Sequence, residues 1–145
     1  GRNGNKSLAF CSGWKLKKGA MASSAAPDDN NLVVMGVNAE DMSIAVNYLI
    51  EQGGGQVVVA DGEILEFLPL PVGGIVSDRE PEEIAAHEKL IDQAARSLGS
   101  DLPDPMMYMF FLPITAIPDY AITDAGPVDY VALTTFDPVL EVVEK

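Results

Sequence analysis

The sequence QVVVADGEILEFL, residues 56–68, carries the strongest structural signal in the chain. It contains two apolar runs, Gln56–Ala60 and Glu63–Leu68, separated by Asp61-Gly62. A type I′ turn needs positive φ at both central residues, and Asp-Gly is one of the dipeptides that meet this need most readily. The stretch therefore predicts a β-hairpin.

A helix is predicted on each side of this hairpin. Upstream, Asn38 precedes Asp41 by three residues, which is close to a capping box, and Gly53-Gly54-Gly55 ends the helix that follows. Downstream, a helix is predicted over Pro81–Leu98, because proline suits a first helical turn. Apolar residues recur at helical spacing in both segments: Met42, Ala45, Val46 and Leu49, then Ile84, Ile91, Ala94 and Leu98.

Three further segments are predicted to be strands. Leu32–Gly36 is a short run with β-branched residues and predicts a buried strand. The run 106–114 is too apolar for a surface element and predicts an interior strand, while 139–143 predicts a weak edge strand. Strands interspersed with two main helices predict a single α/β domain over residues 1–145 with a mixed β-sheet, and α+β is the alternative.

Composition excludes several classes of function. The chain has 145 residues, 22 of them acidic and nine basic, and its net charge of −13 disfavours binding to nucleic acid or to an anionic membrane surface. A single cysteine rules out an internal disulfide and a multi-cysteine zinc site, which fits a reducing cytoplasm. No apolar run reaches the ~20 residues that span a bilayer, and no signal peptide is recognisable. The chain does not begin with methionine, so we expect a piece of a longer protein.

The charge is divided along the chain. Residues 1–26 contain five basic residues and no acidic one, whereas residues 27–145 carry a net charge of −18. Such a basic segment either docks on an acidic body or binds an anion. Docking on its own domain or a neighbouring one is favoured, because the acidic charge must be offset somewhere.

The residue types that usually carry catalysis are sparse. The only histidine, His87, lies in the middle of the second predicted helix and is expected at the boundary of the core. Cys11 is expected to pack as a small apolar group. The polar cluster Asp28-Asp29-Asn30-Asn31 could cap a turn, bind a cation or face a ligand, and the turn is favoured because Asp and Asn form local hydrogen bonds.

Around this cluster, the sequence resembles the C-terminal domain of microbial adenine deaminases. The resemblance covers roughly residues 10–130 in one register. It rests on Leu16–Ser24, Asp28, Asn31, Glu40-Asp41-Met42, Gly53-Gly54-Gly55, Asp61-Gly62-Glu63, Leu68-Pro69-Leu70-Pro71, Ser77-Asp78, Leu102-Pro103-Asp104-Pro105, Ile117-Pro118 and Ile122-Thr123-Asp124.

The resemblance implies a cytoplasmic hydrolase of the amidohydrolase type, active in purine metabolism, that converts adenine to hypoxanthine and ammonia. In that family a divalent metal, manganese or iron, is held by an N-terminal barrel, which this chain lacks; no metal or other cofactor is expected in the chain itself. The implied partners are that barrel and further copies of the chain, with no nucleic acid and no membrane. This domain would complete or cover the active site and be inactive alone. The alternatives are a non-catalytic scaffold domain of a degenerate deaminase and a free-standing small-molecule binder.

One loop departs from the family pattern. Family members usually have Ala-His-Asp-Ser-His-Asn where this chain has Ala26-Pro27-Asp28-Asp29-Asn30-Asn31, so Pro27 and Asn30 replace both histidines. No residue is assigned to catalysis or to metal binding. The predicted edge facing the substrate or the barrel consists of Ser23, Ser24, Asp28, Asp29 and Asn31.

Overall fold

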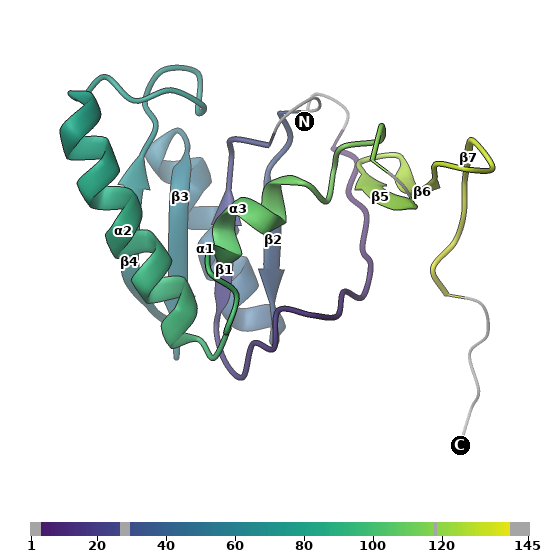
Figure 1. Ribbon diagram of the computed structural model, residues 1–145, viewed down its shortest axis with the longest axis horizontal. Helices are drawn as coiled ribbons and strands as arrows, with labels where there is room; N and C mark the ends of the chain where they lie inside the picture. Colours follow the sequence, from purple (N-terminus) through teal and green to yellow (C-terminus); the bar gives the residue numbers. More distant parts are fainter. Residues whose placement is uncertain (1–3, 27–29, 118, 140–145) are drawn as a thin grey trace.

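The computed structural model describes residues 4–26, 30–117 and 119–139, and it contains two antiparallel sheets and three helices (Figure 1). The main sheet has the strand order β2-β1-β3-β4. Its strands are β1 (Ala20–Ser23), β2 (Val33–Gly36), β3 (Gly55–Ala60) and β4 (Glu63–Pro69), and the helices are α1 (Ala39–Gln52), α2 (Pro81–Ser97) and α3 (Pro105–Phe110). The smaller sheet contains β5 (Tyr120–Thr123), β6 (Gly126–Asp129) and β7 (Thr134–Thr135).

The main sheet is covered by helices on both faces. On one face, Ala45 and Leu49 of α1 pack against Val57 and Val59 of β3. On the other face, residues of α2 and α3 pack against β1 and β3, and this second core contains Met21, Val58, Ile91, Ala95, Leu98, Met106 and Met109. The predicted α/β class is confirmed. All the described strand pairs are antiparallel, where mixed directions were expected.

The hairpin and the first helix form as their local signals predict. Asp61 has φ of 56° and Gly62 has φ of 83°, as a type I′ turn requires. Asn38 caps α1, since its side-chain oxygen accepts a hydrogen bond from the Asp41 N–H at 2.8 Å. Gly53 ends α1 in the left-handed conformation.

The predicted interior strand at 106–114 is wrong, because the chain forms α3 there. Asp104 caps this helix by accepting a hydrogen bond from the Met107 N–H at 2.9 Å, and Pro105 occupies the first turn. Both are helix-start signals. The apolar composition reflects burial against the sheet and not strand structure, because Met106 and Met109 enter the core.

Two other predictions need qualification. The strand at Val33–Gly36 exists, but it is only half-buried because β2 lies at the edge of the sheet. The predicted edge strand at 139–143 falls almost entirely outside the described residues, and Val139 itself is exposed.

The basic N-terminal segment docks on its own domain. Lys15 forms an ion pair with Asp101 at 2.7 Å, and Lys18 forms one with Asp61 at 2.9 Å. The backbone N–H of Lys17 also donates to the carbonyl of Leu98 at 2.8 Å. The docking interpretation is therefore confirmed for the described part of this segment.

The beginning of the N-terminal segment stays out of the core. Cys11 is exposed, so the prediction that it packs as a small apolar group is wrong. Its neighbour Phe10 is 95% exposed, which shows that the chain does not turn inward here. Trp14 is anchored to the domain, since its indole N–H donates to the carbonyl of Pro105 at 3.2 Å.

Candidate functional site

The predicted functional edge lies where β1 ends and the chain crosses to β2. Ser23 is the last residue of β1, Ser24 follows it, and Asn31 is half-buried just before β2. Asp28 and Asp29 lie outside the described residues. The serines and Asn31 therefore lie at one end of the main sheet.

Ser24 links three backbone segments at that end. Its hydroxyl accepts a hydrogen bond from the Gly55 N–H at 2.8 Å and donates to the carbonyl of Gly74 at 2.5 Å. The Ser24 N–H donates to the Gly55 carbonyl at 3.0 Å. The hydroxyl thus joins β1 to β3 and to the loop after β4, which is a structural role.

Replacement of Ser24 by alanine is expected to lower the free energy of unfolding by about 1–3 kcal/mol, because the N–H of the buried Gly55 loses its partner. Urea denaturation followed by circular dichroism measures the change. Ser97→Ala is the control, since Ser97 is exposed and its hydroxyl only donates to the carbonyl of Ala94 in its own helix. A control variant that lost as much stability as Ser24→Ala would contradict this role.

Ser23 faces the α2–α3 side of the sheet. It is fully buried, and its hydroxyl accepts a hydrogen bond from the Ala25 N–H at 3.1 Å. Side chains alternate along a strand, so Ser23 shares its face with Met21, which packs in the core under α2 and α3. Directly opposite Ser23 in the neighbouring strand is Gln56, which by the same alternation points to this face.

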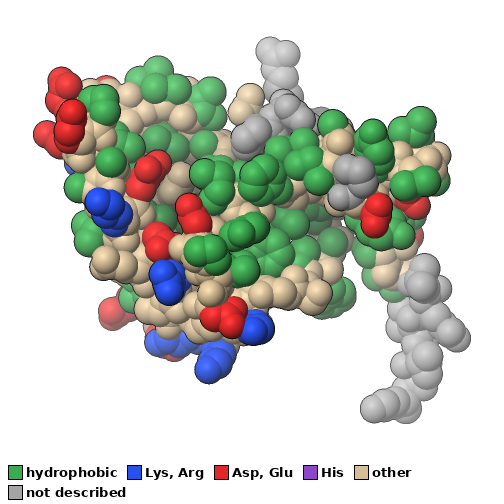
Figure 2. Space-filling model, in the orientation of Figure 1, with side chains coloured by type: hydrophobic (Ala, Val, Ile, Leu, Met, Phe, Trp, Pro, Cys, Tyr) green, Lys and Arg blue, Asp and Glu red, His purple; other side chains and the backbone are tan. Residues whose placement is uncertain are grey.

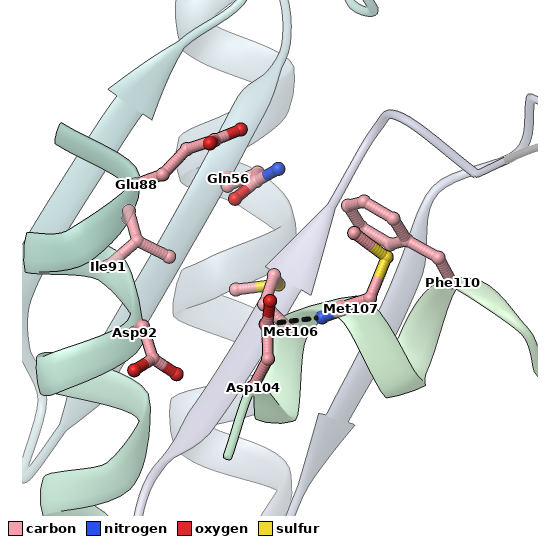
Figure 3. Close-up of a pocket in the computed structure, with 8 residues that line it drawn as sticks. All are labelled: Gln56, Glu88, Ile91, Asp92, Asp104, Met106, Met107 and Phe110. Carbon is pink, nitrogen blue, oxygen red and sulfur yellow. Dashed lines mark hydrogen bonds between the residues drawn. The ribbon is translucent and has the colours of Figure 1, made fainter. Parts of the chain in front are cut away.

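Gln56 forms the floor of a small pocket between α2 and α3 (Figure 3). The pocket has a volume of about 70 Å³. Its other lining residues come from the two helices and from the residue that caps α3, and they are Glu88, Ile91, Asp92, Asp104, Met106, Met107 and Phe110. The pocket thus lies beside Ser23 and combines three carboxylates with apolar side chains.

The carboxylates of this pocket differ in the hydrogen bonds that they accept. Asp104 accepts the capping hydrogen bond from Met107. Asp92 has one carboxylate oxygen, Oδ1, that is buried and has no hydrogen-bond partner among the described residues, while its other oxygen lies 3.9 Å from the Arg96 guanidinium. Burial raises the pKa of the Asp92 carboxyl, the charge of Asp104 raises it further, and Arg96 opposes both effects.

Replacement of Asp92 by asparagine is expected to raise the free energy of unfolding at pH 7 by roughly 0.5–1 kcal/mol. Asparagine has nearly the same shape as aspartate, and the substitution removes a poorly solvated charge. A carboxyl with a raised pKa binds its proton more tightly in the folded state. The wild type therefore loses stability as the pH rises from the ordinary pKa of 3.8, and the advantage of the variant should shrink near pH 4.

The comparison variant for this test is Asp101→Asn. Hydrogen bonding to Lys15 lowers the pKa of the exposed Asp101 carboxyl, so this substitution should give no gain at pH 7. Urea titrations of both variants at pH 4 and pH 7 measure the difference. An equal response of the two variants to pH would contradict the raised pKa of Asp92.

The single histidine lies at the boundary of the core beside a carboxylate, as its sequence position predicts. His87 Nε2 lies 3.0 Å from Glu66 Oε1, and both side chains are partly exposed. Among residues 4–26, 30–117 and 119–139, no three His, Cys, Asp or Glu side chains are grouped so that they could hold a metal ion. None of the described helices is both long and apolar enough to cross a membrane.

The comparisons with known proteins agree with the resemblance found in the sequence. The family model of the adenine deaminase C-terminal domain matches residues 1–134. The chain belongs to this family. It is 83% identical over 140 residues to adenine deaminase 1 of Desulfotalea psychrophila, and 66% identical over 142 residues to adenine deaminase 1 of Latilactobacillus sakei. These alignments cover 97% and 98% of this chain but only 24% of each relative, so the chain spans about a quarter of their length.

The residues around the α2–α3 pocket were missed by sequence reasoning. Gln56 carried a usable signal, because strand alternation places it on the same face as Val58, which is fully buried. Asp104 also carried one, as an acidic residue directly before a proline and an apolar run. The position of Asp92 beside them depends on how α2 and α3 pack, and no sequence pattern indicates it.

Proposed function

We infer that this chain is the C-terminal domain of an amidohydrolase-type enzyme that hydrolyses adenine to hypoxanthine and ammonia. The match of the adenine deaminase C-terminal family over residues 1–134 carries this proposal. The curated relatives, which are named adenine deaminases, are about four times longer than their match to this chain. In this proposal the chemistry belongs to a parent protein that acts in purine metabolism in the cytoplasm.

The role of this domain in the parent is to complete or cover the active site. Adenine hydrolysis in this proposal uses a divalent metal, manganese or iron, which supplies the activated water in the N-terminal barrel. Such a centre needs several histidine ligands, and this chain has one histidine, which contacts Glu66. The metal ligands must therefore come from another segment of the parent. We propose that the domain meets that active site at the sheet end where β1 leads toward β2, with the half-buried Ser24 and Asn31.

A second surface suits contact with a barrel or with other copies of the chain. Apolar side chains lie exposed over α3 and over the smaller sheet, and Figure 2 shows apolar side chains gathered on both parts. The most exposed of them are Tyr120, Val131 and Leu133, at 67%, 75% and 83%. Exposed apolar areas of this kind mark interaction sites.

The second candidate function is a non-catalytic scaffold domain. The replacement of two family histidines by Pro27 and Asn30 favours it, because a loop that touched substrate or metal would have lost those contacts. The upstream sequence of the parent gene separates the two candidates. A barrel that carries His-x-His and further metal ligands supports the hydrolase, whereas a barrel without them supports the scaffold.

A further inference from the structure

The α2–α3 pocket contains polar groups whose hydrogen-bonding capacity is unused. Gln56 is only 8% exposed, and within the described residues its side-chain amide makes no hydrogen bond. Asp92 Oδ1 is buried without a partner in the same part of the structure. Buried polar groups are nearly always paired, so the unpaired amide of Gln56, whose side chain is nine-tenths buried and lines the pocket, indicates a place for a hydrogen-bonding partner.

The size of the pocket limits what can enter. Its volume of about 70 Å³ is far below the ~300–1,000 Å³ of typical small-molecule sites. It is nevertheless several times the ~10–15 Å³ that one water molecule needs. A purine base or a nucleotide is therefore excluded, and the head group of one amino-acid side chain fits.

Charge and shape then select the kind of side chain. Glu88, Asp92 and Asp104 surround the opening with carboxylates, which calls for a cation. Arg96, four residues after Asp92 in α2, lies 3.9 Å from the other Asp92 oxygen and does not line the pocket. A cation that enters the pocket must also lose part of its hydration shell. A guanidinium is more weakly hydrated than an ammonium, which favours arginine over lysine.

The pocket walls fit a planar head group. Phe110 and Met107 line one side, where the face of a guanidinium can stack on an aromatic ring. The amide oxygen of Gln56 and the exposed carboxylate of Glu88 are acceptors that line the pocket, and a guanidinium offers five N–H donors in a fixed plane. One arginine can therefore offer donors to more than one acceptor of the pocket.

We propose that this pocket receives an arginine side chain from the part of the parent protein outside residues 1–145, and so locks this domain onto the rest of the polypeptide. The inference rests on the proposed function only in taking the chain as one domain of a larger enzyme. The relatives are about four times longer than their match to this chain, so the rest of the parent protein can contain this arginine. A second copy of this chain fits less well, because two-fold contact through this face would oppose two acidic surfaces.

The first test is chemical labelling of carboxylates in the native parent protein with a carbodiimide and glycine amide, read by mass spectrometry. Glu88 and Asp104 are exposed in this domain, and so are Glu82 and Glu83 at the start of the same helix. If an arginine covers the pocket, Glu88 and Asp104 should react at least about tenfold more slowly than Glu82 and Glu83. Equal rates for the two pairs would overturn the proposal.

The second test identifies the cation. Phenylglyoxal labelling of the parent should find one arginine outside residues 1–145 that is protected in the wild type and reactive in an Asp92→Asn/Asp104→Asn variant. This variant should fold, because asparagine caps a helix as well as aspartate does. Glu82→Gln/Glu83→Gln is the matched control and should leave that arginine protected.

The remaining outcomes are also decisive. Protected carboxylates without a newly reactive arginine would overturn the proposal in favour of another occupant. Protection that disappears on dilution would overturn it in favour of a second copy. A parent that shows the protection but releases no ammonia from adenine would refute the proposed function and leave this interface standing.

Discussion

Replacement of Leu98 by alanine is expected to lower the free energy of unfolding by about 2–5 kcal/mol. Leu98 is fully buried in the core between the main sheet and the α2–α3 layer. The truncated side chain leaves a cavity beside Gly19, where the N-terminal segment enters β1. The same residue accepts the backbone hydrogen bond of Lys17, so the cavity should also loosen the docked basic segment.

Leu90→Ala is the matched control for this prediction. Leu90 lies in α2, the helix that ends just before Leu98, but is 48% exposed, so its truncation should cost less than about 1 kcal/mol. Urea denaturation of both variants measures the two changes. If Leu98→Ala were no more costly than Leu90→Ala, the core assignment of the α2–α3 layer would be wrong.

Replacement of Gly54 by alanine is expected to cost about 2–5 kcal/mol, from a left-handed backbone and a steric clash together. Gly54 has φ of +122°, and a Cβ atom there would lie 2.4 Å from the Cα of Gly74. The loop that carries Gly74 would have to move away, and the hydrogen bond from Ser24 to Gly74 would break with it. The sheet end that carries the candidate site would then lose its anchor.

Gly53→Ala separates strain from clash. Gly53 also has a positive φ, of +79°, but a Cβ atom there would meet nothing within 4 Å. Its substitution should cost only about 1–2 kcal/mol, from backbone conformation alone. Thermal and urea unfolding of the two neighbouring variants measure the difference, and equal costs would contradict the close approach of Gly54 to Gly74.

Local chemistry explains which parts of the fold could be predicted. The Asp61-Gly62 turn and the Asn38 cap depend on residues adjacent in sequence, so their signals were complete. The segment 106–114 was ambiguous, because a short apolar run suits a buried helix as well as a strand. The decisive cue was the Asp104-Pro105 start signal, which outweighs composition.

The candidate site was only partly predictable for a related reason. Ser23 and Ser24 were assigned to a functional edge, but no strand was predicted at β1, and their hydroxyls bind backbone groups. The unsatisfied groups lie next to them in Gln56 and Asp92, which are 36 positions apart in the sequence and meet only through packing of α2 over β3. Family resemblance pointed to the loop, and tertiary structure was needed to find the pocket.

The central claim is that this domain serves an adenine deaminase whose chemistry lies in another segment. The most direct test is ammonia release from adenine, with manganese or iron supplied, by the parent protein, by the parent lacking this domain, and by the 145-residue chain alone. We predict activity in the parent, a loss of at least roughly a hundredfold on deletion of the domain, and none in the isolated chain. Metal-dependent release of ammonia by the isolated chain would contradict the account.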